Sequence, residues 1–335
     1  MIKGRLTSPS VIKDLATRHG FRFERGLGQN FLIDYNLLQK IVMAAEVGPR
    51  DLVLEVGPGF GTVTQALLPR AGRVLAVELD RRLAPILAET LGDPPNLRLY
   101  FGDVLEAPLP QLLEEEEVRL KEEAGGELAV PPLPSPEAGS GSVNGAEMGR
   151  LAADQSPPQG VQPIVRKAVA NLPYYITTPV LTRLLEPELK LERIVVMVQW
   201  EVAQRLLARP GTPEYGSLTV FVNFLARASL ITRVPRTAFL PPPEVDSAVL
   251  LLRTIAPPAD LDLATFSRVV RAAFGQRRKT LLRALAGGLG LDRATIEERL
   301  ALLGMDWKRR GETLSQEEFL ALTRVLRDLL EKTPE

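Results

Sequence analysis

The chain has 335 residues, 45% hydrophobic and 24% charged, which is long enough for a large core and a second domain. Its 41 basic residues balance 41 acidic ones, and a net charge of zero argues at first against a nucleic-acid partner. The absence of cysteine excludes disulfides and thiolate metal sites, and the single histidine argues against a zinc enzyme, so no metal is expected.

Short apolar runs alternate with helix-patterned segments such as 37–47 and 63–68 over most of the chain. Alternation of this kind predicts an α/β fold with a Rossmann-like, doubly wound, mostly parallel sheet. The predicted strands are 52–56, 74–78, 97–101, 166–170 and 194–198, with further candidates at 218–225 and 246–253. No run is long enough to cross a membrane and no signal peptide is evident, so we expect a cytoplasmic protein without a membrane partner.

Residues 111–160 differ in composition from the segments around them. They begin with the acidic run Glu114–Glu117 and continue rich in proline, glycine and serine. Such a stretch cannot bury enough apolar surface to order itself, which predicts a low-complexity acidic insertion on the surface; an acidic regulatory tail is the alternative. A helix-to-strand connection at this point leaves from the amino ends of the strands, whereas ligands bind at the carboxyl ends.

Only helical patterns remain after about Leu263, at 266–274, 280–289, 293–303 and 317–330, which predicts a small helical domain over 259–335 after a sheet domain over 31–258. The charge divides with the regions. Residues 264–310 carry eleven basic against four acidic residues, 111–160 carry three against ten, and the basic arm 1–30 carries six against two. Without 111–160 the chain has 38 basic and 31 acidic residues, which suits an RNA partner.

The first predicted strand leads into the loop Gly57-Pro58-Gly59-Phe60-Gly61, after which a helix begins. Glycines allow close approach of the backbone to a ligand, and a helix amino end favours negative charge. Thr62 stands where the dinucleotide fingerprint needs its third glycine, and an acid, Glu55, precedes the loop. The loop therefore suits a nucleoside with an amino-acid tail, with a purely structural turn as the alternative.

Carboxylates follow the next two strands. Glu78 closes one strand and can accept hydrogen bonds from both hydroxyls of a ribose. Asp103 follows the other and can accept one from an adenine amino group. Either residue alone would be an ordinary solvated strand end, but three polar strand ends in order predict an adenosyl cofactor.

Asn171-Leu172-Pro173-Tyr174 follows the fourth strand. An adenine amine is a poor nucleophile because its lone pair is delocalised, so catalysis needs acceptors for its two hydrogens. The Asn171 side-chain oxygen and the carbonyl of Leu172 or Pro173 can supply them, and Tyr174 offers a ring on which a flipped base can stack. The alternative is a proline turn with packed aromatics.

Seven motifs occur in one order along the chain: GQNFLID (28–34), GPGFGTVT (57–64), ELD (78–80), GD (102–103), NLPYYITTPV (171–180), FLPPPEVDSAV (239–249) and FGQRRKTLLRAL (274–285). Over about residues 20–110 and 163–330 the chain resembles the ribosomal RNA adenine dimethyltransferase family, closest to its bacterial small-subunit branch. The resemblance implies a class I methyltransferase that uses S-adenosylmethionine. The implied substrate is a pair of adjacent adenosines in a hairpin near the 3′ end of 16S rRNA, in the immature 30S subunit. We expect a monomer.

The family motifs also imply roles for individual residues. The cofactor would contact Asn30, Leu32, Gly57, Gly59, Glu78, Asp103 and Asn171. The ring of Phe239 would stack on the flipped adenine opposite Tyr174, or else be a buried packing ring. Trp200 departs from the family, which commonly has lysine there, so any role of that lysine in contacting RNA is in doubt.

Basic clusters in the helical domain are candidates for RNA phosphate contacts, with a solvated helix face as the alternative for each. They comprise Arg277, Arg278, Lys279, Arg283, Lys308, Arg309 and Arg310. Three other functions stay open: an assembly checkpoint that binds immature 30S with turnover secondary, a 23S rRNA adenine methyltransferase, and a DNA adenine methyltransferase. The motif order and the long helical tail favour the 16S enzyme.

Overall fold

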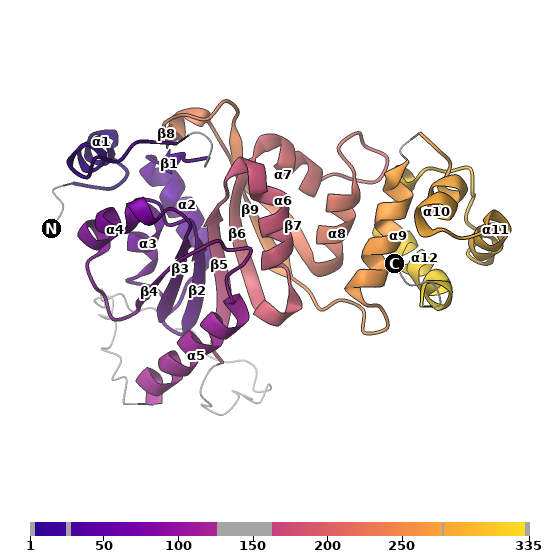
Figure 1. The fold of residues 1–335 in the computed structure, drawn as a ribbon, viewed down its shortest axis with the longest axis horizontal. Coiled ribbons are helices and arrows are strands. Elements are labelled where there is room, and N and C mark those ends of the chain that lie inside the picture. Colours follow the sequence, from indigo (N-terminus) through magenta and orange to yellow (C-terminus); the bar gives the residue numbers. More distant parts are fainter. Residues whose placement is uncertain (1–3, 25–27, 126–162, 277, 332–335) are drawn as a thin grey trace, which may run out of the picture.

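The computed structural model describes residues 4–24, 28–125, 163–276 and 278–331. Its centre is a seven-stranded sheet in the order β4-β3-β2-β5-β6-β9-β7, in which β9 alone runs antiparallel to its neighbours (Figure 1). The strands are β2 (Asp51–Val56), β3 (Arg73–Glu78), β4 (Leu97–Phe101), β5 (Val165–Asn171), β6 (Leu191–Gln199), β7 (Ala226–Val234) and β9 (Ser247–Thr254). The five parallel strands predicted from the sequence, the strand at 246–253 and the doubly wound fold are confirmed.

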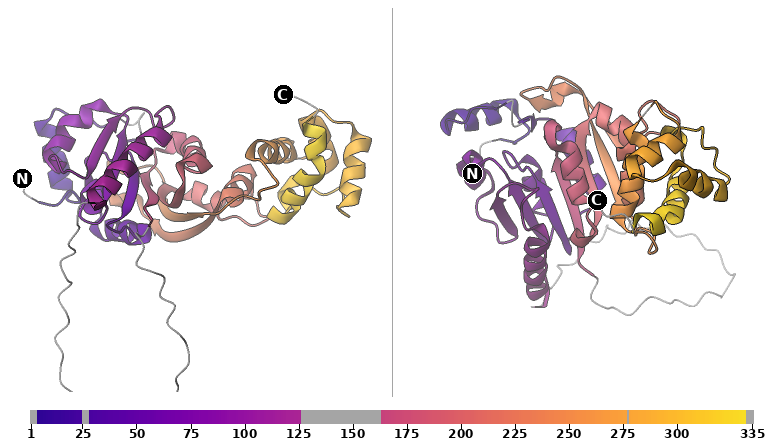
Figure 2. Two further views of the ribbon diagram at one scale, coloured as in Figure 1. Left: turned by 90° about the horizontal axis from the view of Figure 1, so that it is seen from below. Right: turned by 45° about the vertical axis from the view of Figure 1, so that its right-hand side comes forward.

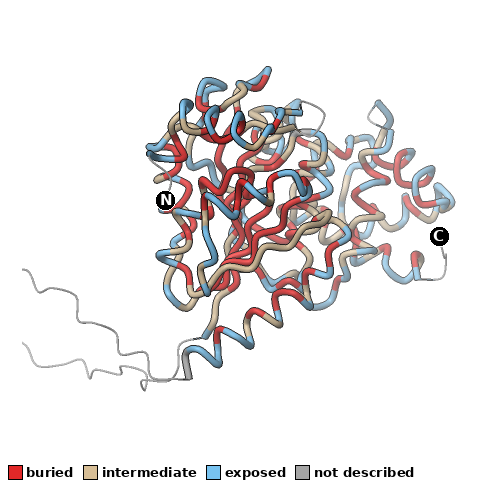
Figure 3. The backbone as a smooth tube through the Cα atoms, turned by 60° about the vertical axis from the view of Figure 1, so that its left-hand side comes forward, coloured by how far each residue is buried: buried red, intermediate tan, exposed pale blue. Residues whose placement is uncertain are grey.

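Helices cover both faces of this sheet because alternate strand residues point to opposite sides. Val53, on β2, joins the core cluster under α2 (Tyr35–Ala45) and α3 (Thr62–Leu67). Its neighbour Leu54 joins a larger cluster on the other face. That face is covered by α5 (Leu109–Gly125), α6 (Thr177–Leu184), α7 (Trp200–Leu206) and α8 (Ser217–Leu225). Figure 3 shows the strands as the most continuously buried part of the tube.

The predicted strand at 218–225 is wrong, since these residues form helix α8 and the strand β7 begins directly after them at Ala226. The segment is apolar on nearly every side, and a short apolar run has no periodicity that separates a buried helix from a buried strand. Helix α8 is apolar all round because it is enclosed between the sheet and α9 (Leu263–Gly275), where the rings of Phe224 and Phe266 stack at 4.1 Å.

The prediction of an unordered acidic segment is wrong over 111–125, which belong to helix α5; residues 126–162 lie outside the described part of the chain. The acidic run pairs with arginines of three strands. Glu116 is fully buried, and its Oε2 atom lies 2.6 Å from Arg73 Nε while Oε1 lies 3.1 Å from Arg98 Nη1. Glu117 pairs with Arg166 at 2.6 Å. Opposite charges thus order a helix whose composition suggested none.

Replacing Glu116 with alanine should lower the free energy of unfolding by about 3–5 kcal/mol, because it leaves the buried Arg73 guanidinium without its carboxylate. Urea unfolding at neutral pH measures the loss. Glu114 lies on the same helix and is exposed, so Glu114→Ala is the control and should change stability by less than about 0.5 kcal/mol. Equal losses in the two variants would contradict a buried ion-pair network.

Helices α9, α10 (Leu281–Leu289), α11 (Arg293–Leu302) and α12 (Gln316–Leu330) form the predicted all-helical part. They project from the α8 side of the sheet (Figure 2, left view). Their core is continuous with that of the sheet, and the Tyr215 hydroxyl donates to the Leu314 carbonyl at 2.8 Å. None of the described helices has the length and apolar composition needed to cross a membrane.

The amino-terminal residues fold onto the sheet domain. Helix α1 (Pro9–Arg18) packs beside α4 (Ala84–Leu91), and the rings of Phe21, Phe31 and Phe60 form one buried cluster there. Arg18 pairs with Asp14 and Glu89, both at 2.8 Å. The charge of this arginine is therefore partly neutralised within the protein.

Candidate cofactor and substrate site

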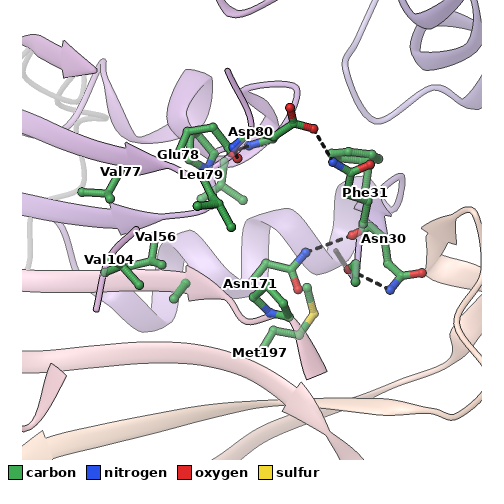
Figure 4. A pocket seen from close by; sticks show the side chains of 18 of the residues that line it. Asn30, Phe31, Val56, Val77, Glu78, Leu79, Asp80, Val104, Asn171 and Met197 are labelled. Carbon is green, nitrogen blue, oxygen red and sulfur yellow. Dashed lines mark hydrogen bonds between the residues drawn. The ribbon is translucent and has the colours of Figure 1, made fainter. Parts of the chain in front are cut away.

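A pocket opens at the carboxyl edge of β2, β3, β4, β5 and β6, beneath the segment 28–32 that contains strand β1 (Phe31–Leu32) (Figure 4). The strand order reverses between β2 and β5, and ligands of doubly wound sheets bind where this happens. Segments far apart in the sequence meet here because parallel strands end at a common edge. The pocket brings together these residues singled out from the sequence: Asn30, Leu32, Gly57, Gly59, Glu78, Asp103, Asn171 and Pro173.

The glycine loop between β2 and α3 requires its glycines for two reasons. The backbone of Gly59 has φ of 59°, which side chains with a Cβ atom rarely adopt, and a Cβ there would lie 2.8 Å from the Phe31 ring. Gly57 also has positive φ, but the nearest atom to a Cβ there would be the Asn171 carbonyl oxygen, 3.8 Å away. A side chain at Gly57 would therefore project into open pocket space.

Glu78 is buried at the end of β3 and anchors two backbone groups. Its Oε2 atom accepts from the Gly59 N–H at 3.1 Å, and its Oε1 atom accepts from the Asp80 N–H at 2.9 Å. Burial raises the pKa of this carboxyl, and the backbone donors oppose that shift. Asp80 in turn accepts from Gln29 Nε2 at 2.7 Å, which ties the covering segment to the end of β3.

The amide of Asn171 is oriented by the covering segment. Its Nδ2 atom donates to the Asn30 carbonyl at 3.0 Å, and the Asn30 side chain donates to the Gly28 carbonyl at 3.1 Å (Figure 4). Because the two polar atoms of an amide lie on opposite sides, Oδ1 turns away from Asn30 and is left as an acceptor. Asn171 is also paired with Met197 of β6, which lines the pocket.

Three predicted residues do not line this pocket. Leu172 is buried, and its backbone N–H donates to the Met197 carbonyl at 3.1 Å. Phe239, in strand β8 (Phe239–Leu240), is 2% exposed and pairs with Leu32 of β1, so its ring is packed in the core under α2. The side chain of Tyr174 lies outside the described part of the chain. Stacking of a base on Phe239 and Tyr174 stays a prediction.

The pocket also contains residues that the sequence alone did not indicate. Tyr175 is 55% exposed and lines it beside Pro173, and Leu79 is 47% exposed at its rim. The doubled tyrosine was a signal for an aromatic rim, but the choice between the two rings depends on the turn Tyr174–Ile176, which the sequence does not specify.

Glu55 is a buried carboxyl directly behind the glycine loop. It is 2% exposed, and its Oε2 atom has no hydrogen-bond partner. Burial raises its pKa to about 8, and the nearby Glu78 charge adds to the shift. The folded protein therefore holds a proton here at neutral pH, which lets a carboxyl remain in an apolar environment.

Replacing Glu55 with glutamine should stabilise the protein increasingly as the pH rises. The folded-state pKa of about 8 lies above the ordinary value of 4.5, so between these values the folded chain binds more protons than the unfolded chain and stability falls with pH. Glutamine has no proton to lose. The melting temperature of the variant relative to the original chain should rise from pH 5 to pH 9, and a difference that is constant across this range would contradict the raised pKa.

The basic residues of the helical part divide into exposed and internally paired groups. Arg309 is half-buried and paired with Glu318, and its Nη2 atom donates to the Thr313 carbonyl at 2.7 Å, so much of its bonding capacity is used within the fold. Arg277 lies outside the described residues. The exposed group comprises Arg278, Lys279, Arg283, Lys308 and Arg310. Within the described ranges, no three or more histidine or carboxylate side chains are arranged to hold a metal ion.

Comparison with known proteins agrees with this geometry. Residues 20–322 match the model of the family described as "Ribosomal RNA adenine dimethylase". A protein named "Ribosomal RNA small subunit methyltransferase A" from Moorella thermoacetica is 43% identical over 325 residues, covering 96% of this chain and 98% of that protein. The protein of the same name from Geobacillus kaustophilus is 41% identical over 98% of this chain and 99% of its own length.

Two solved structures share the fold over most of the chain. A dimethyladenosine transferase from Plasmodium falciparum superimposes with a TM-score of 0.66 at 23% identity, covering 89% of this chain and 98% of that one. The 23S rRNA methyltransferase ErmE gives 0.57 at 26% identity, covering 89% and 100%. The order of the strands, the pocket at their carboxyl edge and the match over residues 20–322 lead to one conclusion: the chain is a methyltransferase that belongs to the ribosomal RNA adenine dimethylase family.

Proposed function

We propose that the chain transfers methyl groups from S-adenosylmethionine to the N6 amines of two adjacent adenosines, twice each, in a hairpin near the 3′ end of 16S rRNA. The observation that carries the proposal is the Asn171 amide, which the Asn30 carbonyl orients at 3.0 Å so that its oxygen is left for a substrate amine. We further propose that the chain acts as a cytoplasmic monomer on the immature 30S subunit.

The residues present fit this cofactor. Glu78 retains lone pairs for the ribose hydroxyls, and Asp103 lies on the adenine side of the pocket. The open space at Gly57 suits the amino-acid tail, since a side chain there would fill it. Asn30 and Leu32 cover the pocket from above. When bound, S-adenosylmethionine supplies a methyl group that its sulfonium has already activated.

The chain's own contribution is to orient the amine. Asn171 Oδ1 accepts one N6 hydrogen, and a backbone carbonyl accepts the other. The Pro173 carbonyl already accepts from the Ile176 N–H and the Thr177 hydroxyl, both at 3.2 Å, which favours the Leu172 carbonyl. Two acceptors hold the nitrogen in a pyramidal geometry that exposes its lone pair, and alignment supplies much of the rate. The methylated amine is acidic enough to release its proton to water.

The helical part, residues 259–335, is proposed as the RNA-binding domain. Its exposed cations Arg278, Lys279, Arg283, Lys308 and Arg310 are suited to phosphate contacts that fix the position of the RNA without reading its sequence. Arg277 and Arg309 belong to the same proposal, with Arg309 weakened by its pairing to Glu318. An assembly checkpoint and methylation of 23S rRNA are the rival functions, the latter because ErmE shares the fold.

One experiment separates these functions. The protein is incubated with methyl-labelled S-adenosylmethionine and immature 30S particles, 50S particles or duplex DNA, and the products are digested to nucleosides. Dimethyladenosine from 30S particles alone is the expected result. Label in 50S particles would support the 23S function, and stable 30S binding without label would support the checkpoint.

A further inference from the structure

A second aromatic and cationic cluster lies at the same edge of the sheet as the pocket, and the residues above do not use it. Trp200 is the first residue of α7, three residues beyond the pocket residue Met197 along β6, which is about 10 Å of strand. Arg233, near the end of β7, lies over the Trp200 ring with its guanidinium carbon 4.8 Å from the ring centroid. We call Trp200, Arg233 and Asp246 the Trp200 platform.

Asp246 fixes the orientation of this arginine. Its Oδ2 atom accepts from Arg233 Nη2 at 2.9 Å, and its Oδ1 atom accepts from the Arg236 N–H at 3.2 Å. The Asp246 carbonyl accepts from the Trp200 N–H at 2.9 Å. One aspartate thus joins the end of β7, the start of α7 and the loop before β9, so the guanidinium plane is held against the indole from two sides.

The arrangement leaves one surface available. Trp200 packs its body against the main core, while the Arg233 side chain remains 58% exposed. An exposed ion pair on its own contributes little to stability, which gives no structural reason to position this guanidinium so closely. A flat, cationic surface fixed beside a pocket is suited to stack on a nucleobase, since guanidinium planes and aromatic rings are the groups on which splayed RNA bases stack.

We propose that the exposed face of Arg233 stacks on the nucleotide next to the adenosine that occupies the pocket, with Trp200 and Asp246 as positioning residues. The inference rests on the proposed function, because only a single-stranded loop presents an unstacked neighbour. It gives Trp200 a role in place of the lysine that the family commonly has there: the tryptophan supports a cation supplied by β7.

Steady-state methylation of immature 30S particles tests the proposal. Arg233→Ala should lower kcat/KM at least about 10-fold, within the range measured for loss of one base-stacking contact, while the Kd for the cofactor measured without RNA stays unchanged. Trp200→Ala should give a similar loss, and the double variant should be no worse than either single one. Arg233→Lys keeps the charge without the plane and should recover only part of the loss.

Two further measurements distinguish stacking from charge or fold. Arg324, paired with Asp260 at 2.6 Å and 46% exposed, is the matched control, and Arg324→Ala should leave kcat/KM within 2-fold. On 30S particles reconstituted with an abasic residue beside the target pair, Arg233→Ala and the original chain should be equal. An undiminished difference on the abasic particles, or no difference on normal ones, would overturn the proposal, whereas failure of the original chain to methylate 30S particles would instead overturn the proposed function.

Discussion

Replacing Asn171 with alanine should lower the rate of methyl transfer about 10²–10³-fold, as happens when one oriented polar group is removed from a reacting centre. The amide is positioned before substrate binds, because its nitrogen donates to the Asn30 carbonyl at 3.0 Å. Alanine leaves the target amine with one acceptor instead of two. Single-turnover transfer to 30S particles at saturating cofactor measures the effect.

A matched control distinguishes a chemical role for Asn171 from a structural one. The Asn96 side chain also donates to backbone carbonyls, those of Leu68 and Ala71 at 3.0 and 3.2 Å, but it lies at the amino edge of the sheet. Asn96→Ala should lower the melting temperature and leave the transfer rate within about 3-fold. If both variants lose activity only in proportion to their stability, Asn171 has no direct part in the reaction.

The parallel part of the fold could be predicted because its strands are buried on both faces. A strand such as Leu52–Val56 therefore appears as a continuous apolar run between turn residues. The same property made α8 unpredictable. Its residues Val220, Val222 and Phe224 are buried on several sides, and a helix enclosed between a sheet and other helices has no polar face to reveal its period.

The order of α5 could not be predicted from its own composition. Glu116 is stabilised by Arg73 and Arg98, which belong to β3 and β4 and lie far away in the sequence. Charge counting treats such residues as a solvated run, because pairing between distant segments has no local signal. The pairing becomes possible only after the strands have placed the arginines side by side.

The main site residues were predictable for a topological reason. Gly57, Glu78, Asp103 and Asn171 each follow a parallel strand, so the fold itself collects them at one edge. The contact between Asn30 and Asn171 spans 141 positions and has no local signal. The resemblance implied a role for Asn30, but only the structure reveals how the covering segment orients the reacting amide.

Replacing Glu78 with alanine should raise the Kd for S-adenosylmethionine at least about 10²-fold while 30S binding persists. A hydrogen bond to a charged group contributes about 1.5–3 kcal/mol, and two ribose hydroxyls would lose their shared acceptor. The variant also leaves the Gly59 and Asp80 N–H groups without the oxygens that they contact at 3.1 and 2.9 Å. The glycine loop should loosen, which weakens binding further.

Glu78→Gln is the conservative control because it keeps the shape and one acceptor oxygen, and it should weaken the cofactor less than alanine does. Burial raises the Glu78 pKa, so protonation should begin to weaken the cofactor at a higher pH than it would with an exposed glutamate. Calorimetric titration across pH measures both effects. Cofactor affinity unchanged in Glu78→Ala would place the ribose elsewhere, and a parallel loss of 30S binding would mean that cofactor and RNA recognition are coupled, against the checkpoint function.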